Sequence, residues 1–140
     1  MKKCLICSNE FNPFVDFGSM PIANAFSTKK ELENEYFFPM QVGFCETCKM
    51  VQLLEQPDRE KMFHDSYAFF SSTSNYMINH FKKFASSVSS LQNLSEKSFV
   101  VEIGSNDGIM LQNFVSDNIP CLGVEPSKNV AHVAMERGIE

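Results

Sequence analysis

The stretch Val101-Glu-Ile-Gly-Ser-Asn-Asp-Gly108 (VEIGSNDG) decides the expected fold of the C-terminal part of this 140-residue chain. Residues 98–104 are nearly continuous apolar sequence, which is typical of a strand buried in a parallel sheet. The glycines that follow predict a tight turn, and the apolar spacing of residues 108–115 predicts a helix. A buried strand, a glycine turn and a helix in this order are typical of nucleotide-cofactor sites.

A second strand is predicted at residues 121–125, followed by a helix that starts at Pro126-Ser127 and ends near Gly138. The predicted order is therefore strand, helix, strand, helix. Glu125 stands at the end of the second strand, where a carboxylate can accept hydrogen bonds from both ribose hydroxyls of a nucleoside. The turn Glu102-x-Gly104-x-Asn106-x-Gly108 resembles the E/D-x-G-x-G-x-G turn of class I methyltransferases, which bind S-adenosylmethionine (SAM). An NAD site would instead favour the spacing G-x-G-x-x-G, so the resemblance favours SAM over NAD as the cofactor.

Two CxxC pairs near the N-terminus, Cys4/Cys7 and Cys45/Cys48, supply the four thiolates of a tetrahedral structural zinc site. The insert between the pairs is longer than in common zinc ribbons. Doubling a loop costs only about 0.6 kcal/mol, however, whereas a structural zinc contributes on the order of 10 kcal/mol. A disulfide pairing, or four unrelated buried thiols, are the alternatives. A catalytic zinc would more often keep an open position, so we expect a closed, structural site.

The second cysteine pair is expected at the tip of a hairpin, because strand signals flank it at residues 38–44 and 50–54. The segment DFGSMPIANAF (16–26) contains Gly18 and Pro21 and is predicted to be rich in turns. Its Phe17, Ile22 and Phe26 are expected to cover the small metal core.

In the middle of the chain, residues 57–64 predict a short helix. A longer helix is predicted after Ser74 as N-cap, with one inward apolar face; that face contains Met77, Phe81, Phe84, Ala85, Val88 and Leu91. These elements give three predicted parts: a zinc-binding domain (1–66), a helical connector (67–95) and the beginning of a cofactor-binding domain (96–140). His64, His80 and His132 have no ligand spacing and are not expected to bind metal.

Composition narrows the function classes. A net charge of -5 without a basic block argues against nucleic acid or an anionic membrane as a partner. The longest apolar runs are far shorter than the roughly 20 residues of a membrane span. The N-terminus lacks the features of a secretory signal. We therefore expect a cytoplasmic protein whose clustered cysteines bind metal.

Taken together, the motifs resemble the bacterial sugar C-methyltransferases, which act on nucleotide-linked keto-deoxysugars. The resemblance covers nearly all of the chain and rests on the order of these segments: Cys4/Cys7, Pro21–Phe26, the segment 44–48 that contains the second cysteine pair, Val51–Leu53, Tyr67, Phe70–Ser74, Glu102–Gly108 and Gly123–Asn129. Asn106 stands where class I methyltransferases commonly have the middle glycine of the turn. Asparagine tolerates the left-handed backbone that such a turn needs.

The resemblance implies an α+β zinc-binding hairpin module followed by the start of an α/β Rossmann-like class I methyltransferase domain. The cofactors implied are zinc and SAM. The implied SAM-binding residues are Tyr67, Ser72, Ser74, Glu102, Gly104, Ser105, Asn106, Asp107, Gly108 and Glu125. Each serine could equally serve a turn or an N-cap.

The resemblance also implies that the catalytic base lies in a later part of the enzyme. We therefore expect an N-terminal piece that is inactive alone and whose partners are the sugar substrate and the missing C-terminal part. Two strands with their helices should leave apolar faces exposed. The alternatives are a zinc-hairpin interaction module without catalytic activity, and a fragment of an NAD-type nucleotide-binding enzyme.

Overall fold

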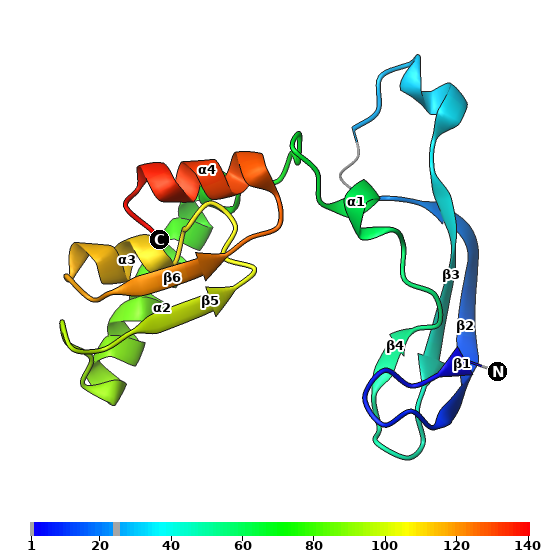
Figure 1. Cartoon of the computed structure of the whole chain (residues 1–140), viewed down its shortest axis with the longest axis horizontal. Coiled ribbons are helices and arrows are strands. Elements are labelled where there is room, and N and C mark those ends of the chain that lie inside the picture. Colours follow the sequence, from blue (N-terminus) through cyan, green and yellow to red (C-terminus); the bar gives the residue numbers. More distant parts are fainter. Residues whose placement is uncertain (1, 24–25) are drawn as a thin grey trace. The chain divides into compact units, whose positions relative to one another are not determined.

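The computed structural model describes residues 2–23 and 26–140 and divides the chain into two compact units, Met1–Met62 and Phe63–Glu140 (Figure 1). Asn24 and Ala25, which belong to the quoted segment Pro21–Phe26, lie outside the described residues. No helix in the described part of the chain is long and apolar enough to cross a membrane.

The first unit is an antiparallel sheet with strand order β1-β2-β3-β4. Its strands are β1 (Lys2–Lys3), β2 (Glu10–Pro21), β3 (Phe37–Phe44) and β4 (Val51–Leu53). A short 3-10 helix η1 (Glu31–Asn34) lies between β2 and β3, and helix α1 (Arg59–Met62) follows β4. The predicted hairpin is confirmed, since β3 pairs with β4 and the second cysteine pair lies in the loop that joins them.

The expectation of a turn-rich segment after residue 16 is wrong for residues 16–21, which continue β2 along β3. The strand is irregular, with register shifts between Pro13 and Val15 and between Asp16 and Ser19. These irregularities explain why the sequence of this segment resembles a series of turns. A bulge adds a residue to one strand and changes which face the following side chains occupy. Phe17 and Phe26 are 56% and 78% exposed and therefore do not cover the metal core.

The core of the first unit is small and gathers around the cysteines. Phe11, which is 5% exposed, packs with the buried Cys4 and Cys45, and Leu54 lies against this cluster. Gly43 of β3 admits the Phe11 ring, because a Cβ at Gly43 would lie 2.4 Å from Phe11 Cε2. So few buried side chains give the unit little hydrophobic stability of its own, and such modules commonly depend on a metal.

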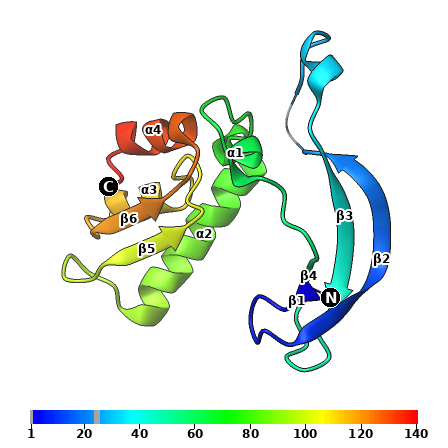
Figure 2. The same ribbon diagram turned by 45° about the vertical axis from the view of Figure 1, so that its right-hand side comes forward.

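The second unit confirms the predicted order of strand, helix, strand, helix. It contains η2 (Ser71–Thr73), α2 (Asn75–Gln92), β5 (Val100–Ile103), α3 (Leu111–Ser116), β6 (Cys121–Val124) and α4 (Lys128–Glu136). The two strands are parallel, with Val100 opposite Cys121 and Ile103 opposite Val124. Both strands therefore end at the same edge of the sheet, as Figures 1 and 2 show.

Helix α2 begins where the sequence predicted, since the Ser74 hydroxyl accepts a hydrogen bond from the Met77 N–H at 3.3 Å. Asn93 ends it in the left-handed conformation, at φ 51. The expected inward face is wrong at Phe84 and Leu91, which are 49% and 77% exposed. Helix α2 is about 27 Å long, whereas four-residue strands are about 13 Å long, so the end of the helix that carries Leu91 extends beyond the sheet. Phe84 lies in the middle of the helix, next to the buried Ala85, on a side that the core does not cover.

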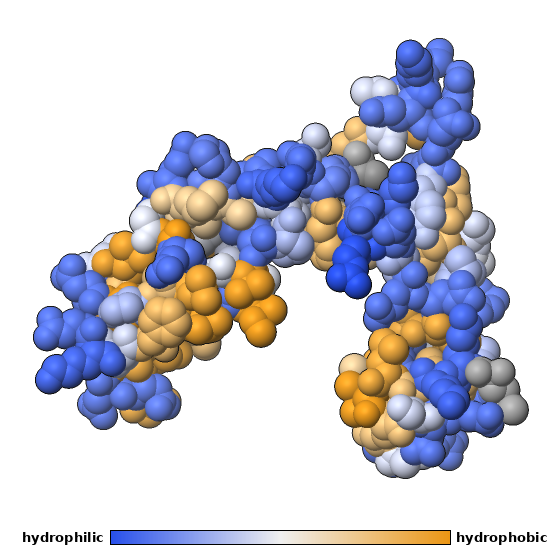
Figure 3. All heavy atoms as spheres, in the orientation of Figure 1, coloured by the Kyte–Doolittle hydropathy of each residue, from blue (hydrophilic) through white to orange (hydrophobic). Residues whose placement is uncertain are grey.

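One face of the two-stranded sheet is apolar and exposed, as expected. Val101, Ile103 and Val124 are 52%, 87% and 47% exposed and share this face by their register. Apolar atoms gather over β5 and β6 in Figure 3. The opposite face packs against the helices, around Leu111 and Phe114.

Replacing Gly43 by alanine should lower the free energy of unfolding of the first unit by about 1–3 kcal/mol, because the added methyl group forces the Phe11 ring out of place. Urea unfolding of the zinc-loaded protein measures the loss. The single variant Phe11→Leu should lower the stability. In the double variant, however, the smaller leucine should relieve part of the clash and so offset part of the Gly43→Ala loss. Strictly additive losses would contradict the predicted clash.

Candidate functional site

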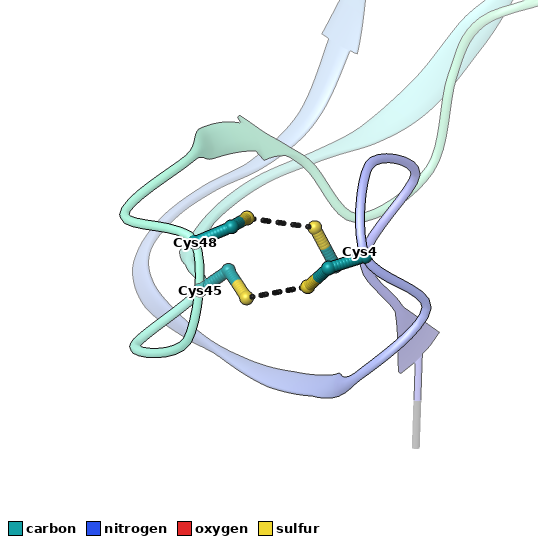
Figure 4. A group of neighbouring side chains, drawn as sticks. Cys4, Cys45 and Cys48 are labelled. Atoms are coloured by element: carbon teal, nitrogen blue, oxygen red, sulfur yellow. Dashed lines mark hydrogen bonds between the residues drawn. The ribbon is translucent and has the colours of Figure 1, made fainter.

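Four cysteine sulfurs meet at one end of the first unit. Cys4 and Cys7 lie in the loop after β1, and Cys45 and Cys48 lie in the loop between β3 and β4. All four Sγ atoms lie within 4.8 Å of one another, and the Cys4–Cys48 and Cys7–Cys45 pairs are 3.5 Å apart (Figure 4). A tetrahedral zinc with bonds of about 2.3 Å places its sulfurs about 3.8 Å apart. The cluster has the size of a zinc site.

The two cysteine loops have the same backbone hydrogen bonds. Cys4 N–H donates to Asn9 O at 2.8 Å, and Cys4 O accepts from Ser8 N–H at 2.9 Å. The second loop repeats this with Cys45 N–H to Met50 O at 2.9 Å and Lys49 N–H to Cys45 O at 2.8 Å. Ser8 and Lys49 occupy the corresponding left-handed positions, at φ 60 and 64. Two like turns thus present their sulfurs from opposite sides.

Electrostatics favours a cation between these sulfurs. Hydrogen bonds from the Asn9 side chain and backbone lower the pKa of Cys7 to about 6. For Cys48, a hydrogen bond from the Met50 N–H lowers the pKa. Lost hydration and the neighbouring Cys4, Cys7 and Cys45 together outweigh this bond and raise the pKa to about 12. One thiolate forms readily, whereas a full set repels itself unless a metal ion neutralises it.

The donor set fits zinc as a structural ion. Four thiolates complete a tetrahedron and leave no open coordination position for a substrate. Cys4 and Cys45 are 2% and 0% exposed, so protein atoms surround half of the ligand set. The alternative of four unrelated thiols does not account for two matched loops that meet at a single point.

A hollow of about 430 Å³ lies at the ends of β5 and β6 in the second unit. It is lined by Phe63, Tyr67, Phe69, Ser71, Ile103, Gly104, Asn106, Val124, Glu125 and Pro126. In open α/β sheets, ligands bind outside the carboxyl ends of the strands, which is where this hollow lies. Four of the predicted cofactor residues therefore meet here: Tyr67, Gly104, Asn106 and Glu125.

Gly104 leaves room in the hollow. Its φ is +76, and a Cβ at this position would meet no atom within 4 Å. The Glu125 carboxylate lies beside the same turn and accepts hydrogen bonds from Asn106 N–H at 3.1 Å and Ser127 N–H at 2.8 Å. A carboxylate has about four lone-pair sites, so Glu125 retains capacity for ligand hydroxyls.

The remaining residues of the turn have structural contacts. Ser105 is buried beside Gly123, where an added Cβ would lie 2.6 Å from Ser105 Oγ. Gly108 faces away from the hollow, because a Cβ there would lie 2.1 Å from Ile139 Cδ1. Asp107 is 0% exposed and accepts hydrogen bonds from both the N–H and the hydroxyl of Ser72. Ser74 caps α2, which is the structural alternative allowed for the serines.

Glu102 lies on the packed face of β5, next to the turn but apart from the hollow's lining residues. Burial raises its pKa from the ordinary 4.5 to about 7. Its Oε2 atom has no hydrogen-bond partner in the described part of the chain. The carboxylate is therefore stabilised only weakly when it is ionised.

Sequence reasoning missed most of the hollow's apolar wall. Ile103, Val124 and Pro126 could have been found, because they flank the ends of the predicted strands. Phe63 and Phe69 carry no motif, and only the folded chain brings them to the hollow. Asn129 ends the matched segment Gly123–Asn129, but its hydrogen bond to the segment before α2 was not predicted, and Arg137, which binds the same segment, carries no motif.

Comparison with known proteins agrees with the cysteine cluster. Residues 4–63 match the family model described as "Putative zinc binding domain". The chain is also 30% identical, over 140 residues, to the C-methyltransferase NovU of Streptomyces niveus. The match covers 99% of this chain and 33% of that protein, so the chain spans about a third of its relative's length. The resemblance to C-methyltransferases with a zinc-binding domain is thereby confirmed.

Metal analysis should find one zinc per chain in the freshly purified protein. Cys45→Ser should abolish stoichiometric zinc and unfold the first unit, because three thiolates cannot close the tetrahedron. Cys121→Ser is the matched control, since Cys121 is also buried but packs in the core of the second unit. Equal zinc loss in both variants, or a metal-free wild type with four titratable thiols, would remove the assignment.

Stability of the second unit should decrease as pH rises from about 4.5 to about 7. Burial raises the pKa of Glu102, so the folded state holds more protons than the unfolded state in this interval. Urea unfolding at several pH values should therefore show a slope that Glu102→Gln flattens. Glu96→Gln, at an exposed site, is the control. An unchanged slope in Glu102→Gln would show that the raised pKa of Glu102 is not the cause of the pH dependence.

Proposed function

We propose that the chain is the N-terminal part of a SAM-dependent C-methyltransferase that acts on a nucleotide-linked keto-deoxysugar. The observation that carries the proposal is the hollow at the ends of β5 and β6, where Gly104, Asn106 and Glu125 come together. Its volume of about 430 Å³ lies within the range of small-molecule sites. The relationship to a C-methyltransferase supports the same conclusion.

The residues of the hollow suit an adenosine-type methyl donor. Gly104 allows close approach of the backbone, and Glu125 at the end of β6 can accept hydrogen bonds from ribose hydroxyls. Phe63, Tyr67 and Phe69 supply aromatic surface for a base or for a cationic sulfonium. With Gly104 as its first glycine, an NAD fingerprint G-x-G-x-x-G would need glycines at 106 and 109, where this chain has Asn106 and Ile109. Two parallel strands joined through α3 are also how a Rossmann-like domain begins.

When bound, SAM would supply an electrophilic methyl group for transfer to carbon. The residues of this chain would bind and orient the donor: Gly104 by leaving space, Glu125 by fixing the ribose, and the aromatic wall by excluding water. Proton removal from the sugar and recognition of the sugar itself are proposed to require residues beyond these 140. The proposed setting is the cytoplasm, where paired thiols hold zinc instead of forming disulfides.

A second candidate function is an interaction module built on the zinc domain. Leu5 and Ile6, inside the first cysteine loop, are 66% and 67% exposed. Exposed apolar residues at a rigid loop are typical of contact surfaces. This function predicts partner binding without SAM binding, so a SAM titration separates the two proposals.

Isothermal titration with SAM should give saturable binding to the wild-type chain, and Gly104→Arg should abolish it by filling the hollow. Gly18→Arg is a closely matched control: Gly18 has φ +74 and, like Gly104 at φ +76, no atom within 4 Å of an added Cβ. It lies in the other unit and should leave SAM affinity unchanged. Tighter binding of NADH than of SAM, or equal loss in both variants, would contradict the proposal.

A further inference from the structure

The segment 67–73, which we term the strap, precedes α2 and forms one wall of the hollow through Tyr67, Phe69 and Ser71. Apart from η2 it has no regular secondary structure, so its backbone groups need partners from elsewhere. Side chains of the second unit supply them. The Asn129 amide donates to Tyr67 O at 2.8 Å, which fixes the start of the strap.

Asn106 holds the centre of the strap with both ends of its carboxamide. Its Nδ2 donates to Phe69 O at 3.1 Å, and its Oδ1 accepts from Ser71 N–H at 2.8 Å. Asn106 reaches this position because its backbone is left-handed, at φ 50. Glycine would adopt the same backbone easily but would offer the strap neither hydrogen bond.

Asp107 holds the next residue of the strap from inside the unit. Its Oδ2 accepts from Ser72 N–H at 3.1 Å and also from the Ser72 hydroxyl. Arg137 supports the pair by donating to Asp107 O at 2.7 Å and to Ser72 Oγ at 2.9 Å. The Asp107 side chain is 0% exposed, and the Arg137 guanidinium lies 3.5 Å from its carboxylate. A buried carboxylate with a charged partner is a strong and rigid anchor.

We propose that Asn106 and Asp107, with Arg137 behind them, are positioning residues that clamp the strap and so preset the aromatic wall of the hollow. The SNDG turn then has two tasks: Gly104 leaves space for the ligand, and the next two polar residues fix the segment that faces it. As far as it concerns SAM, the inference rests on the proposed function. The clamp itself is testable without any ligand.

Hydrogen–deuterium exchange tests the clamp directly at the Ser71 and Ser72 amides. Asn106→Gly should speed exchange of the Ser71 amide by about tenfold or more, since it removes the acceptor of that N–H. Asn118→Gly is the matched control, because Asn118 is also left-handed, at φ 57, but lies between α3 and β6. Equal exchange of Ser71 in both variants, with a thermal melt showing a folded unit, would overturn the clamp.

The variant Arg137→Met tests whether the clamp also affects ligand binding. Arg137 contacts Asp107 and Ser72, outside the lining of the hollow, so a merely structural role predicts lower stability with unchanged affinity for SAM. The clamp predicts faster exchange of the Ser72 amide and roughly tenfold weaker SAM binding by the fraction that remains folded. His132→Met, at an exposed site in α4, the helix that ends just before Arg137, should change neither.

The outcomes separate the two proposals. If wild type fails to bind SAM, the proposed function fails, while the exchange data still decide whether Asn106 and Asp107 order the strap. If wild type binds SAM and Arg137→Met binds it equally well although its strap exchanges faster, the clamp exists but does not position the site, and the inference is overturned.

Discussion

Left-handed backbone at alternate positions of the turn after β5 is the constraint on which the second unit depends. Gly104, Asn106 and Gly108 have φ of 76, 50 and 77, respectively. Gly104 borders open space in the hollow, Asn106 reaches the strap, and Gly108 admits the Ile139 side chain. A β-branched residue at any of these positions would be strained whatever its neighbours. One short turn thus fixes the floor of the hollow, one of its walls and the packing of the C-terminal residues.

The first unit depends on a different constraint, the repulsion and desolvation of closely spaced sulfurs. Among the described residues, its buried core contains little beyond Phe11, Phe38 and the cysteines themselves, so the metal replaces the apolar interior that larger domains have. The two cysteine loops come from sequence positions far apart, and they reach the metal through the same pattern of backbone hydrogen bonds. Zinc binding and folding are therefore expected to be one process in this unit.

Features that depend on local residue spacing and on residue type could be predicted from the sequence. The paired cysteines, the hairpin at residues 45–48, the Ser74 cap and the parallel β5–α3–β6 unit follow from spacing and turn chemistry. Features set by tertiary contacts could not. The bulges of β2 changed the faces of Phe17 and its neighbours, and Asp107 is buried beneath a strap whose partners are distant in sequence. The exposure of Leu91 depends on sheet size, which no local pattern encodes.

The central claim is that the ends of β5 and β6 form a site for SAM. Backbone amide chemical shifts recorded while SAM is added test it most directly, because they locate a ligand residue by residue. The account predicts saturable shifts at Gly104, Asn106, Glu125 and the strap, with the amides of β2 and β3 unmoved. Shifts confined to the zinc-binding unit, or no shifts at millimolar SAM, would contradict it.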